Sequence, residues 1–374
     1  CRVGCLRACC AVVNLLFGSN LSQWGGGEKW MLTAAEAMAE RGHRVSLCAP
    51  TGSELLARAP ASIETFAVDF VRDFDPVSFL RVWRHCRRRR IDVFCLNMDR
   101  VLRVGGLAAR LAGVRAVIPR RGSEFPLKGH LNYRFQYQVV ATALVVNSRA
   151  TERTLCRDID WRPRGRVHVL HNGLDLRPYQ DPRPRREVRA ELALADDDLV
   201  VLNVGELTTR KNAALLVSVV PDLLAEFPRL RVLLVGEGDQ RHALQQQVEA
   251  LGVGDHVRLL GFRRDVADLL NAGDVLAHTA HVEGFGFAVA EAMACGLPTV
   301  VTNASSLPEV IEEGVTGFAF DDDDADGLRA ALQRYLADPA LRREHGEAGR
   351  RRVHTHFELG AKMDELERIL ELET

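Results

Sequence analysis

Residues 283–300 read Glu-Gly-Phe-Gly-Phe-Ala-Val-Ala-Glu-Ala-Met-Ala-Cys-Gly-Leu-Pro-Thr-Val. A glycine-rich loop leads into a run of small apolar residues, and a β-branched run follows, which predicts a loop, a helix and a strand in that order. Glu283 lies in the loop, and Glu291 lies two helical turns further on. If the whole segment were helical, the two carboxylates would address one side of the helix, roughly 12 Å apart.

The loop and its two glutamates have the chemistry of a site for a sugar and an anion. The glycines at positions 284 and 286 let backbone amides at the start of a helix approach an anion closely. An ionised carboxylate accepts hydrogen bonds from hydroxyl groups, so one glutamate can reach a sugar and the other a ribose. The alternative is a surface helix with two solvated glutamates. It is disfavoured because an otherwise apolar helix of small residues gains nothing from an isolated Glu291.

Strands and helices alternate on either side of this stretch throughout the C-terminal half. Short apolar runs predict strands over 199–204, 231–235, 257–260, 275–277 and 299–301, and helical patterns cover 213–224, 241–250 and 327–336. Such an alternation builds a mostly parallel sheet with helices on both faces. The C-terminal half is therefore predicted to be a doubly wound, Rossmann-like domain.

The N-terminal half has the same organisation. An apolar run at 10–16 opens into a loop at Gly18, and a glycine-rich turn at 25–28 precedes a helical pattern that ends near Gly42. Further strands are expected at 44–48, 93–96, 116–119 and 143–146. A second doubly wound domain is therefore predicted, and the fold class is α/β.

The boundaries of the two domains follow from the segments between them. A length of 374 residues suits two such domains. The proline-rich segment around Pro182 and Pro184 has no apolar periodicity, so we interpret it as a connector. Apolar residues at helical spacing from Leu359 to Leu370 predict a last helix that packs on a domain already formed. We expect domains over 1–178 and 179–352 that face a cleft, and a helix over 353–374 that returns toward the first domain.

Composition excludes several classes of protein. The chain has 49 lysines and arginines against 50 aspartates and glutamates, so no overall charge directs it to nucleic acid. No run of about eighteen apolar residues occurs, so we expect a soluble or peripheral protein. The nine cysteines are odd in number, which is typical of reduced thiols in a cytosolic protein. Cys1, Cys5 and Cys9 have no histidine near them, so we interpret this segment as a poorly ordered N-terminus and not as a metal site.

Arginines concentrate in the N-terminal half. The apolar and basic stretch 77–86 is followed by four arginines at 87–90, which predicts a basic amphipathic helix. Two interpretations stay open. The helix either touches an anionic bilayer or a lipid-linked acceptor, or it covers the sheet and carries arginines at the end that the helix dipole favours.

Three other polar features are weaker. The acidic run 321–324 directly precedes the expected helix 327–336, so we interpret it as the start of that helix and not as a metal site. Asp158 and Asp160 lie between the domains and are interpreted as a loop. His278 and His281 precede Glu283. His281 could contact a ligand, and a packed or solvated histidine is an equally supported interpretation.

Taken together, these motifs resemble the retaining nucleotide-sugar glycosyltransferases of the GT-B fold, specifically glycosyltransferase family 4, also called the group 1 glycosyltransferases. The resemblance extends over nearly the whole chain. It rests on residues 25–28, 171–175, 204–205, 210–212, 235–238 and 261–263 together with the two-glutamate stretch.

The resemblance implies a function for several of these residues. An N-terminal domain would bind the acceptor and a C-terminal domain the nucleotide sugar. Glu283 would contact the transferred sugar, Lys211 would neutralise the leaving diphosphate with help from Arg210, and Glu291 would bind the ribose. Fixed cations and helix amides would replace the metal that other transferases use, so no metal or other cofactor is expected. These residues and the surrounding backbone make up the implied donor site: Gly25, Gly26, Gly27, Gly205, Arg210, Lys211, Gly236, Phe262, Arg263, Glu283, Gly284, Phe285, Gly286, Phe287 and Glu291.

The sequence departs from the family pattern at two places. The family commonly has an arginine where this chain has Glu206, which puts contact of that position with the diphosphate in doubt. A histidine is also common where this chain has Arg121, so Arg120 and Arg121 are candidates for a charge role on the acceptor side.

The resemblance also implies a place in the cell. Related enzymes mostly build lipopolysaccharide, capsule or other envelope polysaccharide, so we expect a cytoplasmic hexosyltransferase-type enzyme, with peripheral contact at the inner face of the cytoplasmic membrane. Two alternatives stay open: a GT-B-fold nucleotide-sugar epimerase, and a non-catalytic scaffold derived from the fold.

Overall fold

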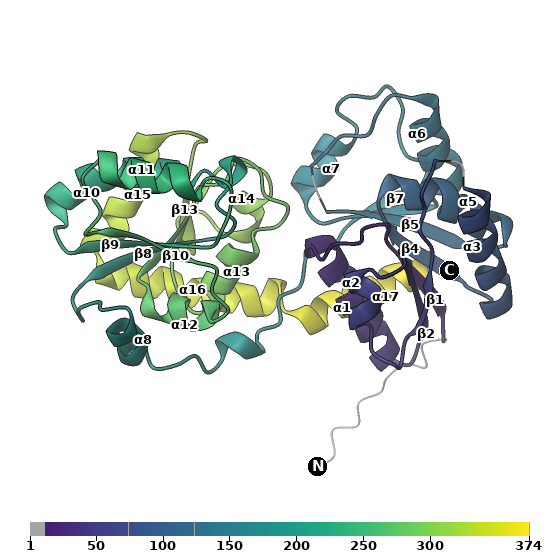
Figure 1. Ribbon diagram of the computed structural model, residues 1–374, viewed down its shortest axis with the longest axis horizontal. Helices are drawn as coiled ribbons and strands as arrows, with labels where there is room; N and C mark the ends of the chain where they lie inside the picture. Colours follow the sequence, from purple (N-terminus) through teal and green to yellow (C-terminus); the bar gives the residue numbers. More distant parts are fainter. Residues whose placement is uncertain (1–11, 74, 123, 374) are drawn as a thin grey trace, which may run out of the picture. The chain divides into compact units, whose positions relative to one another are not determined.

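The structure is a computed structural model that describes residues 12–73, 75–122 and 124–373 (Figure 1). The chain divides into two compact units. Unit 1 holds the described residues up to Asn147, then Thr151–Leu170 and the end of the chain from Lys362; unit 2 holds Ser148–Ala150 and His171–Ala361. In this described part of the chain, no helix has the length and apolar character needed to cross a bilayer. The interpretation of Cys1, Cys5 and Cys9 lies outside the described residues.

Unit 1 is built on a seven-stranded parallel sheet with the order β3-β2-β1-β4-β5-β6-β7. Its strands are β1 (Asn14–Gly18), β2 (Arg44–Ala49), β3 (Glu64–Ala67), β4 (Val93–Asn97), β5 (Ala116–Arg121), β6 (Ala143–Val146) and β7 (Arg166–Val169). The order reverses between β1 and β4, and ligands of doubly wound sheets bind at the carboxyl ends of the strands at such a switch point.

Helices cover both faces of this sheet. They are α1 (Gly26–Glu40), α2 (Glu54–Arg58), α3 (Pro76–Arg89), α4 (Asp99–Val101), η1 (Leu102–Gly106), α5 (Leu107–Leu111), α6 (Leu131–Phe135), η2 (Gln136–Val140) and α7 (Arg149–Leu155). On one face, Leu16 and Phe94 pack with Val82 of α3 and Ala109 of α5 in a single buried cluster. α1 lies on the other face (Figure 1). Such strands are buried on both faces, which explains their almost continuous apolar sequences.

Unit 2 is built on a six-stranded parallel sheet with the order β10-β9-β8-β11-β12-β13. Its strands are β8 (Leu199–Val204), β9 (Leu230–Val235), β10 (Val257–Gly261), β11 (Val275–His278), β12 (Thr299–Thr302) and β13 (Gly317–Phe320). Here the order reverses between β8 and β11. The carboxyl ends of these two strands therefore mark the expected ligand position.

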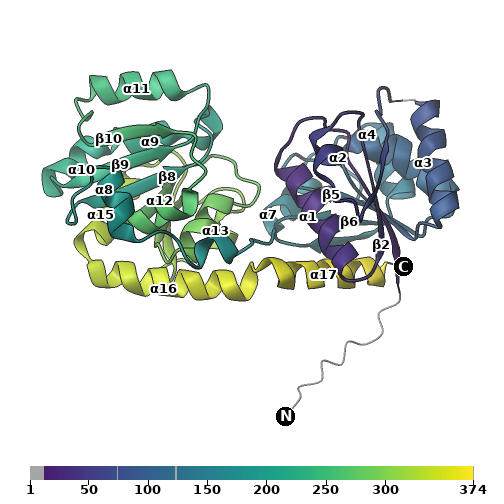
Figure 2. The same cartoon turned by 60° about the horizontal axis from the view of Figure 1, so that its bottom comes forward.

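The helices of unit 2 also form a layer on each face. They are η3 (Arg177–Tyr179), α8 (Arg185–Glu191), η4 (Thr209–Lys211), α9 (Ala213–Ser218), α10 (Val220–Glu226), α11 (Arg241–Ala250), α12 (Val266–Ala272), α13 (Phe287–Ala294), α14 (Leu307–Val310), α15 (Ala325–Ala337) and α16 (Pro339–His356). Leu202 and Val204 of β8 face α12, α13 and α16 in one buried cluster, and Val201 faces α9, α11 and α15 in another. α16 lies against α13 and α15 (Figure 2).

The last helix, α17 (Leu359–Leu372), joins unit 1 from Lys362 onward. Its buried residues are Met363, Leu366, Ile369 and Leu370. Arg41 donates a hydrogen bond of 2.6 Å to Asp364, and His43 Nε2 lies 2.9 Å from Glu367 Oε1. The helix is thus fixed by both apolar burial and ion pairs.

The prediction of an α/β fold with two doubly wound domains is confirmed. The single helix expected over 213–224 is two helices, because Pro221 occupies the first turn of α10 and cannot continue α9. The strand expected at 10–16 is β1 at Asn14–Gly18, and the helix expected over 353–374 begins only at Leu359, because α16 extends to His356. The elements that were not predicted include β3, β7, β13, α8, α12, α14 and α16.

Candidate active site

Two loops meet at the switch point of unit 2. The loop after β8 carries Arg210 and Lys211, and the loop after β11 carries Glu283. Thr279 Oγ1 donates a hydrogen bond of 3.2 Å to the carbonyl of Lys211, and the N–H of His281 donates one of 3.0 Å to the carbonyl of Arg210. Arg210 Nη1 donates in turn to the carbonyl of Val282 at 2.9 Å. These cross-links hold the two loops together.

Glu283 is the centre of this arrangement. Its Oε2 forms an ion pair with Lys211 Nζ and lies 3.1 Å from His278 Nε2, and its Oε1 accepts a hydrogen bond of 3.1 Å from the N–H of Gly284. Burial alone would raise the pKa of this carboxyl, but the hydrogen bond with His278 and the charge of Lys211 hold the pKa well below its usual range. Glu283 is therefore ionised at neutral pH.

The segment between the two glutamates is only partly helical. α13 begins at Phe287 with Gly286 as N-cap, and Gly286 has a φ of 92°, a backbone conformation that favours glycine. The predicted order of loop, helix and strand is confirmed, with Glu283 in the loop, so the spacing calculated for a fully helical segment does not apply. Phe285 is buried in the apolar core, where it makes edge contacts with Phe287 and Phe357, so its side chain serves packing.

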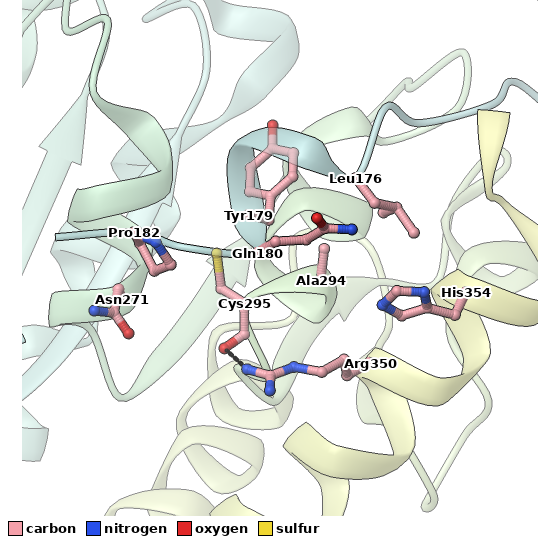
Figure 3. Close-up of a pocket in the computed structure, with 9 residues that line it drawn as sticks. All are labelled: Leu176, Tyr179, Gln180, Pro182, Asn271, Ala294, Cys295, Arg350 and His354. Carbon is pink, nitrogen blue, oxygen red and sulfur yellow. Dashed lines mark hydrogen bonds between the residues drawn. The ribbon is translucent and has the colours of Figure 1, made fainter. Parts of the chain in front are cut away.

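Glu291 lies on α13 and is hydrogen-bonded to Tyr179 of η3. Burial and the neighbouring Glu291 carboxylate together raise the pKa of the Tyr179 phenol well above its usual range. Tyr179 also lines a pocket of about 460 Å³ at the C-terminal end of α13 (Figure 3). In this pocket, Arg350 of α16 donates a hydrogen bond of 2.9 Å to the carbonyl of Cys295. The two glutamates thus each have a partner outside their own motif.

The other predicted donor-site residues of unit 2 lie on loops after the neighbouring strands. Gly205 follows β8, Gly236 follows β9, and Phe262 and Arg263 follow β10. The side chain of Phe262 is exposed. Arg263 is engaged within unit 2, because its Nη2 lies 2.5 Å from Asp265 and 3.1 Å from Glu191. Gly205 thus lies next to the Lys211 side chain, and the Phe262 side chain is exposed to solvent.

Gly236 allows the loops after β8 and β9 to approach closely. A Cβ atom at this position would lie 1.8 Å from the carbonyl oxygen of Gly205, and φ is +144°. Gly236→Ala is therefore expected to lower the free energy of unfolding of unit 2 by about 3 kcal/mol or more. Denaturant unfolding measures this change. Gly254→Ala is the matched control, because nothing lies within 4 Å of its added Cβ; equal stability of the two variants would contradict the expected clash.

The glycine-rich turn of unit 1 lies at the other switch point. Gly25 is the N-cap of α1, and Asn97 at the end of β4 donates a hydrogen bond of 3.0 Å to the carbonyl of Gly27. Glu28 is buried and accepts a hydrogen bond of 2.8 Å from Ser19 Oγ. The turn that holds Gly25, Gly26 and Gly27 is thus anchored to the carboxyl ends of β1 and β4.

Arg120 and Arg121 end β5 in unit 1 and have different surroundings. The Arg120 guanidinium is buried and lies 4.2 Å from the centre of the Trp30 ring. Burial lowers the pKa of Arg120 to about 10, so it keeps its charge at neutral pH. Arg121 Nη1 donates hydrogen bonds to Asp99 at 3.0 Å and to Tyr137 at 2.9 Å. Both cations are fixed by neighbours within unit 1.

The acidic run 321–324 starts α15, as predicted. Asp324 is the N-cap and accepts a hydrogen bond of 3.0 Å from the N–H of Gly327. Asp322 and Asp323 lie next to His281, whose Nδ1 is 2.8 Å from Asp322 Oδ1. His281, which is half-buried, thus pairs with an exposed aspartate of unit 2.

Two residues that contact the predicted glutamates are absent from the predicted site. No role was predicted for His278, and none for Tyr179. The available signal for His278 was its place at the carboxyl end of a strand, five residues before Glu283. Tyr179 lies in the connector, where no pattern of the sequence pointed to Glu291.

Comparison with known proteins identifies the class of this fold and site. The family model for Glycosyltransferase Family 4 matches residues 24–177, and the model for Glycosyl transferases group 1 matches residues 184–352. Together these models extend over both units. The chain belongs to the group 1, family 4 glycosyltransferases, which confirms the prediction of a GT-B glycosyltransferase made from the sequence.

Individual relatives agree with this assignment. The lipopolysaccharide core biosynthesis glycosyltransferase LpsD of Rhizobium meliloti is 26% identical over 356 residues, which are 92% of this chain and 94% of LpsD. A D-inositol 3-phosphate glycosyltransferase of Streptomyces avermitilis is 32% identical over 230 residues, 58% of this chain and 49% of that protein. This chain is therefore an enzyme of the glycosyltransferase class, and the epimerase and scaffold alternatives are set aside.

Solved structures share the fold. Anabaena HepE in complex with UDP superposes with a TM-score of 0.84 at 22% identity, over 96% of this chain and 100% of HepE. WaaG, a glycosyltransferase involved in lipopolysaccharide biosynthesis, superposes with a TM-score of 0.71 at 20% identity, over 95% of this chain and 99% of WaaG. The fold is therefore GT-B.

Proposed function

We propose that this enzyme transfers a sugar from a nucleoside diphosphate sugar, held by unit 2, to a glycan or lipid-linked acceptor, with retention of anomeric configuration and without a metal ion. The contact of Lys211 with Glu283 at the switch point supports this most directly. It brings a cation suited to a diphosphate and a carboxylate suited to sugar hydroxyls to one place. The HepE structures with UDP and with UDP-glucose support a nucleotide sugar as the donor.

The proposed donor extends from Glu283 along α13 and across the neighbouring loops. Its sugar contacts Glu283, and its diphosphate lies between Lys211 and the backbone amides at the start of α13, where the helix dipole favours negative charge. Glu291 accepts hydrogen bonds from the ribose, and the base lies near Phe262, whose exposed ring offers a surface for stacking. Arg210 directly precedes Lys211 in the chain and offers a second cation to the diphosphate.

Cleavage of the donor leaves a nucleoside diphosphate with added negative charge. The backbones of Lys211 and Arg210 are held at the site by the cross-linked loops, so both cations stay near enough to stabilise this charge. Glu283 is ionised and contacts the sugar as positive charge develops on it. We propose that a donor phosphate oxygen takes the acceptor proton, because the lowered pKa of Glu283 makes its carboxylate a weak base.

Metal-free transfer predicts resistance to chelation. Release of nucleoside diphosphate is measured with a donor panel of UDP-glucose, UDP-galactose, UDP-N-acetylglucosamine, GDP-mannose and ADP-glucose, with and without EDTA. The rate with the active donor is expected to change by less than about twofold, because fixed cations serve the leaving group. Full loss in EDTA that magnesium restores would refute the proposal. The anomeric configuration of the product, observed by NMR, tests retention.

The acceptor is proposed to be a precursor of lipopolysaccharide or another envelope polysaccharide. LpsD and WaaG are both named for lipopolysaccharide biosynthesis, and LpsD matches nearly the whole chain. In unit 1, Arg121 is the candidate for contact with the acceptor. Its Nη2 donates a hydrogen bond of 2.8 Å to the carbonyl of Phe125, whose own side chain is exposed.

We also propose that α3 touches an anionic bilayer, at the inner face of the cytoplasmic membrane. Val82 and Cys86 of α3 are buried against the sheet, while Val77 and Leu80 are 62% and 58% exposed. The exposed arginines of the same helix are Arg81, Arg84, Arg87, Arg88 and Arg89. One face of the helix covers the sheet, and the other combines apolar residues with arginines, as membrane-surface helices do, which supports the proposed contact.

Reversing charge on that exposed face tests membrane contact. The double variant Arg84→Glu and Arg88→Glu is expected to weaken binding to phosphatidylglycerol vesicles by at least about tenfold at low salt, because each arginine near an anionic surface contributes about 1 kcal/mol. Co-sedimentation with vesicles measures the change. The control is Arg343→Glu with Arg351→Glu, two exposed arginines on α16. Equal losses in both pairs would mean that net charge, and not α3, directs binding.

A further inference from the structure

His278 stands out among the polar side chains that the proposed mechanism leaves unused. It ends β11, the strand beside the switch point, and is only 2% exposed. Its Nε2 lies 3.1 Å from Glu283 Oε2. Thr302 Oγ1 donates a hydrogen bond of 3.4 Å to the backbone carbonyl of His278.

The hydrogen-bonding state of this imidazole follows from its surroundings. Burial lowers the pKa of His278, against the influence of Glu283, so the ring is neutral at neutral pH. A neutral imidazole has a single N–H, and only an Nε2–H can donate to the Glu283 carboxylate. His278 Nδ1 is buried and has no hydrogen-bond partner among the residues that the structure describes. An apolar side chain would pack here without leaving such an atom unpaired, so the histidine is best explained by its bond to Glu283.

Glu283 Oε2 has two partners of different kinds. Lys211 is a flexible cation, and His278 is a fixed neutral donor inside the core. In the proposed reaction, the Lys211 ammonium is needed by the diphosphate of the donor. When the ammonium shifts toward the phosphates, a carboxylate that is only 14% exposed loses its charge partner and still needs a donor to keep its orientation.

We infer that His278 is a positioning residue, which holds Glu283 Oε2 in place for the sugar while Lys211 turns from Glu283 to the diphosphate. This inference rests on the proposed donor site. His278 acts through Glu283 and does not itself touch the donor. The carboxylate must face the developing charge during turnover. Loss of His278 should therefore lower kcat more than it weakens donor binding.

Three substitutions at this position test the inference. His278→Leu removes the donor but keeps the site apolar and filled, and His278→Gln places an amide N–H near the position of Nε2. The assay is release of nucleoside diphosphate from the member of the donor panel that wild type uses best. We expect His278→Leu to lower kcat by about 10- to 100-fold with KM changed by less than about threefold, and His278→Gln to recover most of the loss. His278→Asn, whose shorter amide does not reach Oε2, should resemble His278→Leu and replaces it if that variant does not fold.

A matched control separates positioning from packing. Thr302→Val removes the hydrogen bond to the His278 carbonyl and keeps the volume of the side chain, without touching Glu283. Its kcat should stay within about twofold of wild type. The double variant His278→Leu with Glu283→Gln should be no slower than Glu283→Gln alone, because the two residues act as one unit.

The outcomes separate this inference from the proposed function. Wild-type kcat in Glu283→Gln would mean that the donor site itself is wrongly assigned. Loss of activity in Glu283→Gln with kcat unchanged in His278→Leu would overturn only the role of His278. Equal losses in His278→Leu and His278→Gln, or a similar loss in Thr302→Val, would also overturn it, since packing alone would then explain the effect.

Discussion

Glu283→Gln is expected to lower kcat for sugar transfer by about 10²- to 10³-fold, the usual effect of removing one preorganised electrostatic group from an active site. The amide keeps the size of the side chain but removes the charge that faces the sugar. It also breaks the ion pair with Lys211. Steady-state release of nucleoside diphosphate from the active donor measures the loss.

A second glutamate serves as the control for this substitution. Glu249→Gln changes an exposed carboxylate at the end of α11, far along the chain from the site, and should leave kcat within about twofold of wild type. Circular dichroism establishes that both variants are folded. If the folded Glu283→Gln variant kept the activity of wild type, the assignment of Glu283 to the sugar would be wrong.

Lys211→Ala is expected to weaken binding of the nucleoside diphosphate by about 10- to 100-fold, because it removes a charge-assisted contact with phosphate. Thermal unfolding of wild type with UDP, GDP, ADP and CDP first identifies the base, since a ligand that binds only the native state raises its stability. The shift for that nucleotide should largely disappear in Lys211→Ala.

The unliganded variant gives a second expectation. Lys211→Ala leaves the Glu283 carboxylate without its cation, so its melting temperature without nucleotide should also fall. Lys362→Ala is the control, because Lys362 is likewise paired with a glutamate, at 2.8 Å from Glu365, and lies in α17. A full nucleotide shift in Lys211→Ala would remove Lys211 from the diphosphate site.

The sequence predicted the central strands well and the outer elements poorly. β8 and β9 lie within one residue of their expected bounds, because strands buried on both faces have continuous apolar runs. β3 reads Glu-Thr-Phe-Ala and lies at the edge of its sheet, where partial exposure removes that signal. α16 is rich in arginine and has few apolar positions, so its helical periodicity is weak in the sequence.

The candidate site was predicted by resemblance more than by periodicity. The motif with Glu283 was visible in the sequence, but its contact with Lys211 depends on the parallel pairing of β8 with β11, which no local pattern specifies. The role of His278 depends on burial at a strand end, which a single histidine in a sequence does not reveal. Local sequence patterns thus do not reveal the order of strands that are distant in the chain.

The membership of α17 in unit 1 has a consequence for how this protein can be made. Residues from Lys362 onward complete a unit whose other parts end at Leu170, and Met363, Leu366, Ile369 and Leu370 are buried there. During synthesis, the part of unit 1 that leaves the ribosome first must wait for the α17 residues before its apolar surface is covered. A fragment cut at the connector would keep that surface exposed, so unit 1 can be obtained alone only if the α17 sequence is supplied to it.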